Sequence, residues 1–179
     1  ELKRLSTDGE FLRIGALVTW TDLIKTKMPT ALDGLKQSAQ EIGAIQIQNR
    51  ATLVGNICNA SPAADGVPPL LTLNAQVELN SIRGARRLPL ATFLQGSRQI
   101  DKQSDELVTA ILLPEASLAG VSSFKKLGFR KYLVISVSMV AARLVLDSHN
   151  CISDAFVSVG SCSAVAQRLT ELERGVAGQ

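Results

Sequence analysis

The spacing of apolar residues predicts a strand and two helices in the early part of the chain. Residues 11–16 form an apolar-rich run that is typical of a strand. Thr19 can cap a short helix, because Asp22 stands at the third helical position. The second helix follows Pro29 and stops at Gly43; its apolar residues at helical spacing are Ala31, Leu32, Leu35, Ala39 and Ile42.

Between residues 43 and 69 this periodicity disappears. Residues typical of turns crowd the segment, namely Gly55, Asn56, Asn59, Ser61, Pro62, Asp65, Gly66, Pro68 and Pro69. Loops of this length are uncommon inside compact domains, and those that occur are usually functional. We therefore expect a long functional loop here.

Strand patterns return after residue 75. Residues 76–81 and 86–90 alternate around a turn at 82–85, which predicts a hairpin, and residues 106–113 form another strand. Pro114 ends that strand and opens a segment with Ser117 and Gly120. This segment, 115–122, is the expected boundary between two units, 1–117 and 118–179.

The second unit is expected to be a three-stranded antiparallel meander followed by a helix. Residues 123–128, 133–146 and 152–159 are rich in Val, Ile and Ser, and residues 147–150 form a turn. The closing helix is predicted from an apolar face made of Val165, Leu169, Leu172 and Val176. The predicted fold class is α+β, with helices and antiparallel sheet in both units.

Composition narrows the class of protein. With 46% apolar and 20% charged residues, the 179-residue chain can bury a core. The net charge of +3 is scattered, and aromatic residues make up only 4%, too few for a surface that stacks nucleobases. No apolar stretch reaches the ~18 residues of a membrane span, and the first residues lack the apolar region of a signal peptide. We expect a cytoplasmic protein that binds no nucleic acid.

Cysteine and histidine offer no metal site. Cys58, Cys151 and Cys162 lie far apart in the sequence, which excludes an iron–sulfur cluster bound by this chain alone. Buried apolar positions are the simplest expectation for all three. His149 lies in a turn-like sequence and is expected at the surface.

The segment 48–65 carries the candidate chemistry. Gly55 would allow a ligand to approach the backbone, and short side chains that can form hydrogen bonds are supplied by Thr52, Asn56, Asn59 and Ser61. Asp65 is a fixed acceptor of the kind that binds sugar hydroxyls. The same residue types also build tight structural loops, so the residues alone leave a ligand site and a structural loop equally open.

A family resemblance favours the ligand site. The string Ala-Thr-x-x-Gly-Asn-Ile-x-Asn-Ala-Ser-Pro-x-x-Asp at 51–65 and the string Pro-Pro-Leu-Leu-x-Leu-Asn-Ala-x-Val-Glu-Leu at 68–79 are its core. Together they resemble the second flavin-binding motif of the FAD subunits of molybdenum hydroxylases, the xanthine dehydrogenase and carbon monoxide dehydrogenase type enzymes. Similar stretches at 12–16, 105–114, 124–130 and 159–163 extend the resemblance over nearly the whole chain.

The resemblance assigns roles to individual residues. It implies that the flavin diphosphate and ribityl region is lined by Thr52, Leu53, Val54, Gly55 and Asn56, with Asn59 and Ser61 as further hydrogen-bonding residues of the cofactor site. Asp65 would bind a cofactor hydroxyl, Ile42 and Val108 would make apolar contacts, and Lys125 would place a positive charge near the flavin. For Lys125 the alternative is an ordinary surface lysine. No acid–base catalytic residue and no metal ligand are expected.

The resemblance also implies the partners. FAD would receive electrons from iron–sulfur clusters and pass them to NAD or another acceptor, while the molybdopterin and the [2Fe–2S] clusters belong to other subunits or domains. An iron–sulfur subunit and a molybdopterin subunit are therefore the expected partners. The chain resembles a form truncated at both ends, without the family's glycine-rich pyrophosphate loop, so it is not expected to be active alone.

Two positions depart from the family pattern. Val54 stands where the family usually has a glycine, and a valine would be strained there if the position required a positive φ. Val134 replaces an aspartate, which removes a local hydrogen bond. Val54, together with the missing pyrophosphate loop, leaves one alternative open, a cofactor-free assembly module of the same fold.

Overall fold

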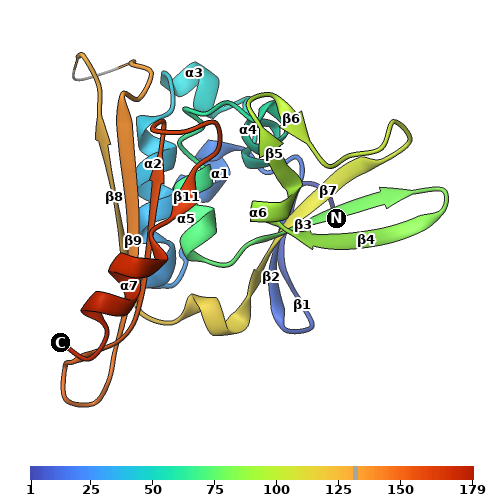
Figure 1. The fold of residues 1–179 in the computed structure, drawn as a ribbon. Coiled ribbons are helices and arrows are strands. Elements are labelled where there is room, and N and C mark those ends of the chain that lie inside the picture. Colours follow the sequence, from blue (N-terminus) through green and yellow to red (C-terminus); the bar gives the residue numbers. More distant parts are fainter. Residues whose placement is uncertain (131–132) are drawn as a thin grey trace.

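The computed structural model describes residues 1–130 and 133–179. In this part of the chain it has two large antiparallel sheets with helices between them and a small two-stranded sheet (Figure 1). The predicted α+β class, with antiparallel sheet in both halves of the chain, is confirmed. Within the described residues, no helix is long and apolar enough to cross a membrane.

The first sheet has five strands in the order β1-β2-β7-β3-β4. Their bounds are β1 Leu5–Asp8, β2 Phe11–Gly15, β7 Leu107–Pro114, β3 Gln76–Ser81 and β4 Gly84–Pro89. The predicted hairpin is confirmed, but Ser81 pairs with Gly84, so the turn is shorter than expected and β4 begins earlier. Three small elements follow β4, namely α6 Leu90–Phe93, β5 Leu94–Gly96 and β6 Gln99–Ile100.

The two helices predicted from the early sequence are present. Helix α1 (Trp20–Lys25) begins at Thr19, which forms a capping box with Asp22. A 3₁₀ turn, η1 (Thr30–Leu32), leads into α2 (Asp33–Glu41). Gly43 adopts a φ of 54° just beyond α2, in agreement with its predicted role as a helix stop.

The long loop predicted for residues 43–69 is wrong. The segment forms three short helices, α3 (Ile45–Gln48), α4 (Leu53–Asn59) and α5 (Val67–Thr72). Each has seven residues or fewer, too few turns for a helical period to stand out in the sequence. The two prolines of α5 stand in its first turn, where a proline's missing N–H costs nothing.

The second sheet is the predicted meander with one additional strand. Its order is β11-β10-β9-β8, and its strands are β8 Val121–Leu127, β9 Ser138–Leu146, β10 Ile152–Gly160 and β11 Gln167–Arg168. Strand β9 begins later than the predicted residue 133. The closing helix α7 (Thr170–Val176) excludes Val165 and Leu169, because the chain first forms β11. A 3₁₀ turn, η2 (Glu115–Leu118), joins the two sheets.

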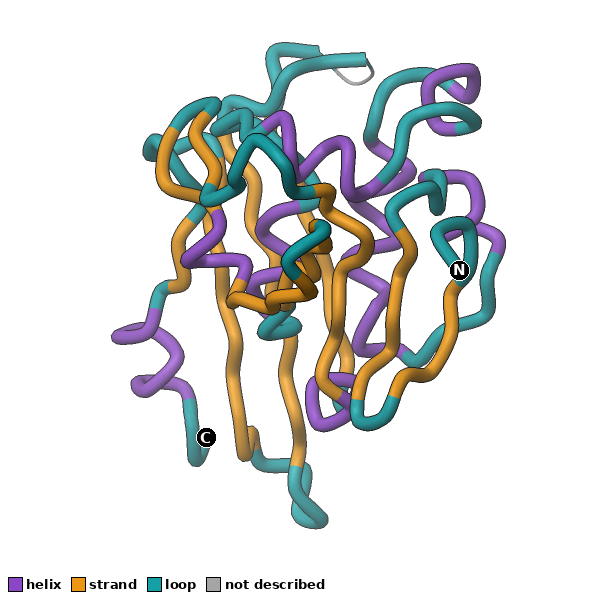
Figure 2. Tube along the Cα trace, turned by 90° about the vertical axis from the view of Figure 1, so that its right-hand side faces the viewer, coloured by secondary structure: helices purple, strands orange, loops and turns teal. Residues whose placement is uncertain are grey.

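Helices α2 and α5 fill the space between the two sheets. Helix α2 packs on β8, and α5 packs on β9 and β10; Figure 2, turned toward the five-stranded sheet, shows the helices behind its strands. Arg143 of β9 is 2% exposed and donates to the carbonyl oxygens of Thr72 (2.9 Å) and Ala119 (3.0 Å). The second sheet is thus tied directly to the end of α5.

The structure also places the cysteines and the histidine. Cys58 and Cys151 are half-buried, and Cys162 is exposed, so the expectation of burial is wrong for Cys162. His149 is exposed as predicted.

Candidate functional site

Helix α4 is fixed on one side by the segment that follows β2, residues 18–20. The backbone N–H of Trp20 donates to the carbonyl of Ala51 (3.2 Å), and that of Leu53 donates to the carbonyl of Val18 (3.4 Å). Leu53, fully buried, belongs to the main hydrophobic core. The helix therefore has one face fixed against the core, and only its other face can meet a ligand.

The first turn of α4 is capped by its own sequence. The Thr52 hydroxyl oxygen accepts a hydrogen bond from the Gly55 N–H at 2.9 Å. Val54 lies inside the helix, is 6% exposed, and is not among the described residues with positive φ. The strain considered for valine at this position therefore does not arise. Because the side chains of Leu53 and Val54 face the core, only their backbone atoms are available to a cofactor.

The open face of α4 carries Gly55, Asn56 and Asn59. Gly55 is exposed, and a Cβ atom there would meet only the Thr52 hydroxyl, at 3.1 Å, so the backbone is uncovered on this side. The Asn56 side-chain oxygen accepts from the Gly66 N–H at 3.2 Å, and the Asn59 side-chain oxygen accepts from Arg98.

Both amide oxygens are thus occupied, while the amide NH₂ groups of Asn56 and Asn59 have no partner within residues 1–130 and 133–179. The hydroxyl groups of Thr52 and Ser61 accept hydrogen bonds in the same region but donate none. Two amides and two hydroxyls therefore remain as donors. Such a set suits a ligand rich in acceptor oxygens, such as a phosphate or a polyhydroxyl chain.

Asp65 ends the segment in a buried network. Its carboxylate accepts from Lys126 at 2.6 Å and from the Ser136 hydroxyl at 2.6 Å. Asp65 is 6% exposed and the Lys126 side chain is 6% exposed. Each carboxylate oxygen thus has a protein partner, and a cofactor hydroxyl would have to use a remaining lone pair.

Lys125 and Lys126 lie on opposite faces of β8. Lys126 points inward to Asp65, whereas Lys125 is exposed and has no ion pair in the described part of the chain. Lys125 lines a polar cavity of about 330 Å³ together with Gln37, Gln40, Glu41, Phe124 and Lys126. The expectation that Lys125 lies near a flavin remains a prediction.

Ile42 and Val108, the two residues predicted to make apolar contacts with the cofactor, lie outside the α4 segment. Ile42 follows the end of α2, where its carbonyl accepts from the Gln48 side chain at 3.1 Å. Val108 lies in β7, which contacts α4. Both are half-buried and pack against the main core, and their contacts with a cofactor remain a prediction.

Three residues that contact the segment were missed from the sequence: Arg98, Lys126 and Ser136. The only sequence signal was the position of Lys126 beside Lys125 in a motif that resembles the family's strand. Arg98 stands among polar residues and Ser136 within an apolar run, and neither position carried a signal.

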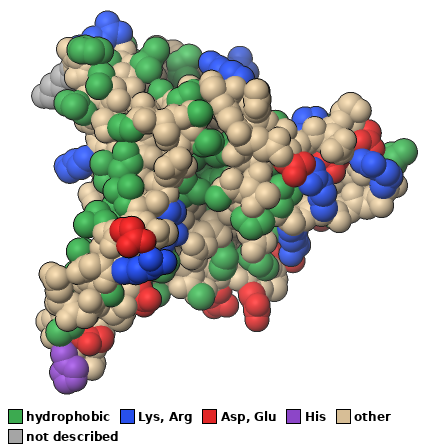
Figure 3. All heavy atoms as spheres, viewed as in Figure 1, with side chains coloured by type: hydrophobic (Ala, Val, Ile, Leu, Met, Phe, Trp, Pro, Cys, Tyr) green, Lys and Arg blue, Asp and Glu red, His purple; other side chains and the backbone are tan. Residues whose placement is uncertain are grey.

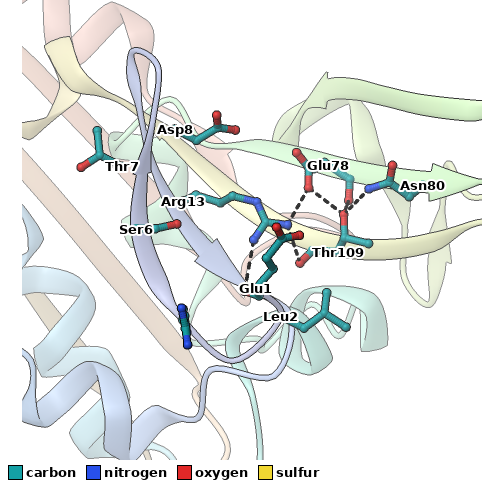
Figure 4. Close-up of a pocket in the computed structure, with 10 residues that line it drawn as sticks. Glu1, Leu2, Ser6, Thr7, Asp8, Arg13, Glu78, Asn80 and Thr109 are labelled. Atoms are coloured by element: carbon teal, nitrogen blue, oxygen red, sulfur yellow. Dashed lines mark hydrogen bonds and ion pairs between the residues drawn. The ribbon is translucent and has the colours of Figure 1, made fainter.

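A second polar cavity, of about 480 Å³, lies beside β1 and β2 (Figure 4). Arg13 and Glu78 are paired in this cavity: Glu78 accepts from Arg13 at 2.8 Å and from Thr109 at 2.8 Å, and Thr109 accepts from Asn80 at 2.7 Å. Burial would raise the pKa of Glu78, but hydrogen bonds from Arg13 and Thr109 bring it below its ordinary value. This cluster joins strands β2, β3 and β7 and contains none of the predicted site residues.

The β3–β4 hairpin projects as an arm on which charged residues gather (Figure 3). Arg86 binds Glu106 at 2.7 Å and Asp101 at 2.9 Å. The Arg86 hydrogen bond, with one from the Gln103 backbone, lowers the pKa of Glu106 to about 2. Ile82 at the tip is fully exposed. The arm is stabilised by its own ion pairs and presents no donor set like that of α4.

Comparison with known proteins shows which family the chain belongs to. The family model described as the FAD binding domain in molybdopterin dehydrogenase matches residues 1–116. The chain is 34% identical to the nicotinate dehydrogenase FAD-subunit of Eubacterium barkeri, with 76% of this chain and 48% of the relative covered. It is 36% identical to the xanthine dehydrogenase FAD-binding subunit of Escherichia coli O157:H7, with 82% and 50% covered.

Solved structures share the fold. Reconstituted CO dehydrogenase from Oligotropha carboxidovorans superposes with a TM-score of 0.91 at 23% identity, over 99% of this chain and 62% of the matched chain. The present chain spans about half the length of the two curated relatives.

Proposed function

Because the chain belongs to the FAD-binding domain family of the molybdopterin dehydrogenases, we propose that the open face of α4 and the loop to Asp65 hold FAD in the electron-transfer component of a molybdenum hydroxylase. One observation carries this placement. The donor groups of Thr52, Asn56, Asn59 and Ser61, which have no acceptor within residues 1–130 and 133–179, lie along one short segment, next to the uncovered backbone of Gly55.

The donor set fits the chemistry of the cofactor. FAD carries a diphosphate, a polyhydroxyl ribityl chain and a ribose ring, which are rich in acceptor oxygens. Amide and hydroxyl donors from Thr52, Asn56, Asn59 and Ser61 would bind such oxygens, and Asp65 would accept from a hydroxyl group. Lys125 would contribute a positive charge that favours an anionic flavin. When bound, FAD supplies the ability to accept electrons and pass them on.

The wider assembly forms part of the same proposal. Electrons would arrive from iron–sulfur clusters and leave to NAD or another acceptor, and the partners would be an iron–sulfur subunit and a molybdopterin subunit. The relatives named as FAD subunits of dehydrogenases support this assignment. Residues of this chain would bind and orient the cofactor, and none would act on the substrate.

We also propose a division of the chain near residue 117. All strands of the five-stranded sheet end by Pro114, all strands of the four-stranded sheet begin at Val121 or later, and the family model ends at residue 116. The units 1–117 and 118–179 would share the helices α2 and α5 as a common packing layer.

The test is a titration of FAD into the full chain, in its assembled form, followed by flavin fluorescence. Asn56→Ala removes one donor, together with the acceptor of the Gly66 N–H. We expect roughly tenfold weaker binding, since a hydrogen bond to a charged group contributes about 1.5 kcal/mol. Asn80→Ala is the matched control, because Asn80 is also half-buried but bonds Thr109 in the other cavity.

Two results would contradict the proposal. Equal affinities for Asn56→Ala and Asn80→Ala would move the cofactor away from α4. Failure of the unaltered protein to bind FAD at micromolar concentration would favour the alternative, an assembly module without cofactor.

A further inference from the structure

The turn between β5 and β6 lies against the C-terminal end of α4. The backbone N–H of Arg98 donates to the carbonyl of Ala60 at 2.8 Å. The guanidinium group of Arg98 donates to the carbonyl of Asn59 at 3.2 Å and to the side-chain oxygen of the same asparagine. Arg98 therefore supplies hydrogen bonds to the carbonyl oxygens of Asn59 and Ala60, which have no partner inside the helix at the C-terminal end of α4.

Both partners in this contact have left-handed backbone conformations. Ala60 has a φ of 45° and Arg98 a φ of 61°, values that non-glycine residues rarely adopt. Such conformations persist where the surrounding structure holds them. Here the Arg98 N–H bonds the carbonyl of Ala60, so each strained residue is held by the other.

The contact has a consequence for Asn59. A primary amide carries its oxygen and its NH₂ group on opposite sides of one carbon atom. Because the oxygen of Asn59 accepts from Arg98, the NH₂ group must point away from Arg98. Asn59 is exposed, so this NH₂ group is presented to the surface as a donor.

We propose that Arg98 is a positioning residue of the cofactor site: its guanidinium group orients Asn59 as a donor toward FAD, while its backbone N–H holds the end of α4 from which the loop to Asp65 departs. This inference rests on the proposed function. Arginine suits the task because its guanidinium is planar and rigid, and one of its nitrogens, Nη1, donates to both oxygens of Asn59. Arg98 also forms no ion pair within residues 1–130 and 133–179, so its side chain is not drawn toward a carboxylate.

Arg98→Gly is the informative variant. Glycine adopts a φ of 61° without strain and keeps the backbone N–H that bonds Ala60, so the turn should fold as before. Only the guanidinium group is lost. Arg83→Gly is the control, because Arg83 is also an exposed arginine in a hairpin turn, and it pairs with Asp105 on the projecting arm.

The experiment measures FAD affinity and thermal midpoint of the full chain, in its assembled form. We expect Arg98→Gly to weaken FAD binding about five- to tenfold, as loss of one oriented donor should, with an unchanged thermal midpoint. Arg98→Lys should fall between Arg98→Gly and the unaltered protein. The double variant Arg98→Gly/Asn59→Ala should bind FAD no more weakly than Asn59→Ala alone, because both changes remove the same oriented amide.

Each outcome decides a different point. If the unaltered protein binds FAD and Arg98→Gly binds it within twofold, the positioning role is wrong and the proposed function stands. Losses that simply multiply in the double variant would also overturn the role of Arg98 in orienting Asn59. If the unaltered protein binds no FAD, the proposed function fails and this inference fails with it.

Discussion

Lys125 and Lys126 are adjacent in β8, and replacing each with methionine should give opposite results. The Lys126 side chain is 6% exposed, and its ammonium nitrogen lies 2.6 Å from a carboxylate that is 8% exposed. Lys125 is exposed, and its side chain bonds no described residue. The two substitutions remove the same side chain from the same strand, so they differ only in what each lysine contacts.

Lys126→Met should destabilise the fold strongly. Removing one member of a buried ion pair costs about 3–5 kcal/mol, because the other charge is left buried and unpaired. Ser136 still donates to Asp65 in this variant, so we expect the lower end of that range, about 3 kcal/mol. For a chain of this size such a loss lowers the thermal midpoint by roughly 6–12 °C.

Urea and thermal denaturation of the full chain measure both variants. Lys125→Met should lie within about 0.5 kcal/mol of the unaltered protein. The double variant Asp65→Leu/Lys126→Met should recover most of the lost stability, because an apolar pair of similar volume often replaces a buried ion pair without loss. FAD affinity should respond differently from stability: Lys125→Met should weaken FAD binding without changing the stability of the fold.

Two results would refute this reasoning. Equal destabilisation by Lys125→Met and Lys126→Met would show that burial of the pair does not decide the energy. A double variant less stable than Lys126→Met alone would show that the carboxylate of Asp65 has a stabilising role apart from the lysine.

Two further predictions concern hydrogen bonds of the described residues. Hydrogen bonds from Arg13 and Thr109 outweigh burial and lower the pKa of Glu78. This carboxylate therefore stabilises the fold above its unfolded pKa, about 4.3, and the stabilisation is lost as pH falls through the lower folded pKa. Glu78→Gln should lower the urea midpoint at pH 7 and lower it much less at pH 3. Thr52→Val removes the cap on Gly55 and should cost about 1 kcal/mol in thermal denaturation, whereas a loss below 0.3 kcal/mol would contradict the capping role.

The sequence predicted the elements that have enough length to show a period. Strands β2, β3 and β7 and helix α2 each alternate or repeat over several residues, and all were found with small errors at their ends. The capping box of α1 could also be predicted, because Thr19 and Asp22 are only three positions apart. In these cases local chemistry and tertiary packing agree.

The errors fall where tertiary contacts decide the local structure. Helices α3, α4 and α5 were taken for a loop, because their glycine, asparagine and proline residues favour turns. Packing decides otherwise, since α4 buries Leu53 and Ile57 and α5 is buried along its whole length. Residues 133–137 were taken for strand because of their valine and isoleucine, yet β9 starts only at Ser138.

The candidate site shows the same limit. Residues from Thr52 to Asp65 are consecutive in sequence, so one motif could indicate all of them. Their protein partners come from 39, 61 and 71 positions away, as Arg98, Lys126 and Ser136. No local pattern encodes such contacts. The sequence therefore indicates the candidate segment but gives little signal for the distant residues that hold it.

What holds the segment determines how well it can bind. Arg98 holds the start of the loop after α4, at Asn59, and the Lys126 and Ser136 side chains hold the end of that loop, at Asp65. In between, the Ser161 N–H donates to the Pro62 carbonyl at 3.0 Å.

The donors of the segment are therefore ordered before a ligand arrives, and the entropy of ordering them is lost in folding rather than in binding. Three of these four contacts to the segment come from residues beyond 117, on or beside β8, β9 and β10. On the proposed function, the contacts of the second sheet with residues 61–66 would keep these donors ordered, and substitutions that loosen those contacts should weaken FAD binding even where every donor is intact.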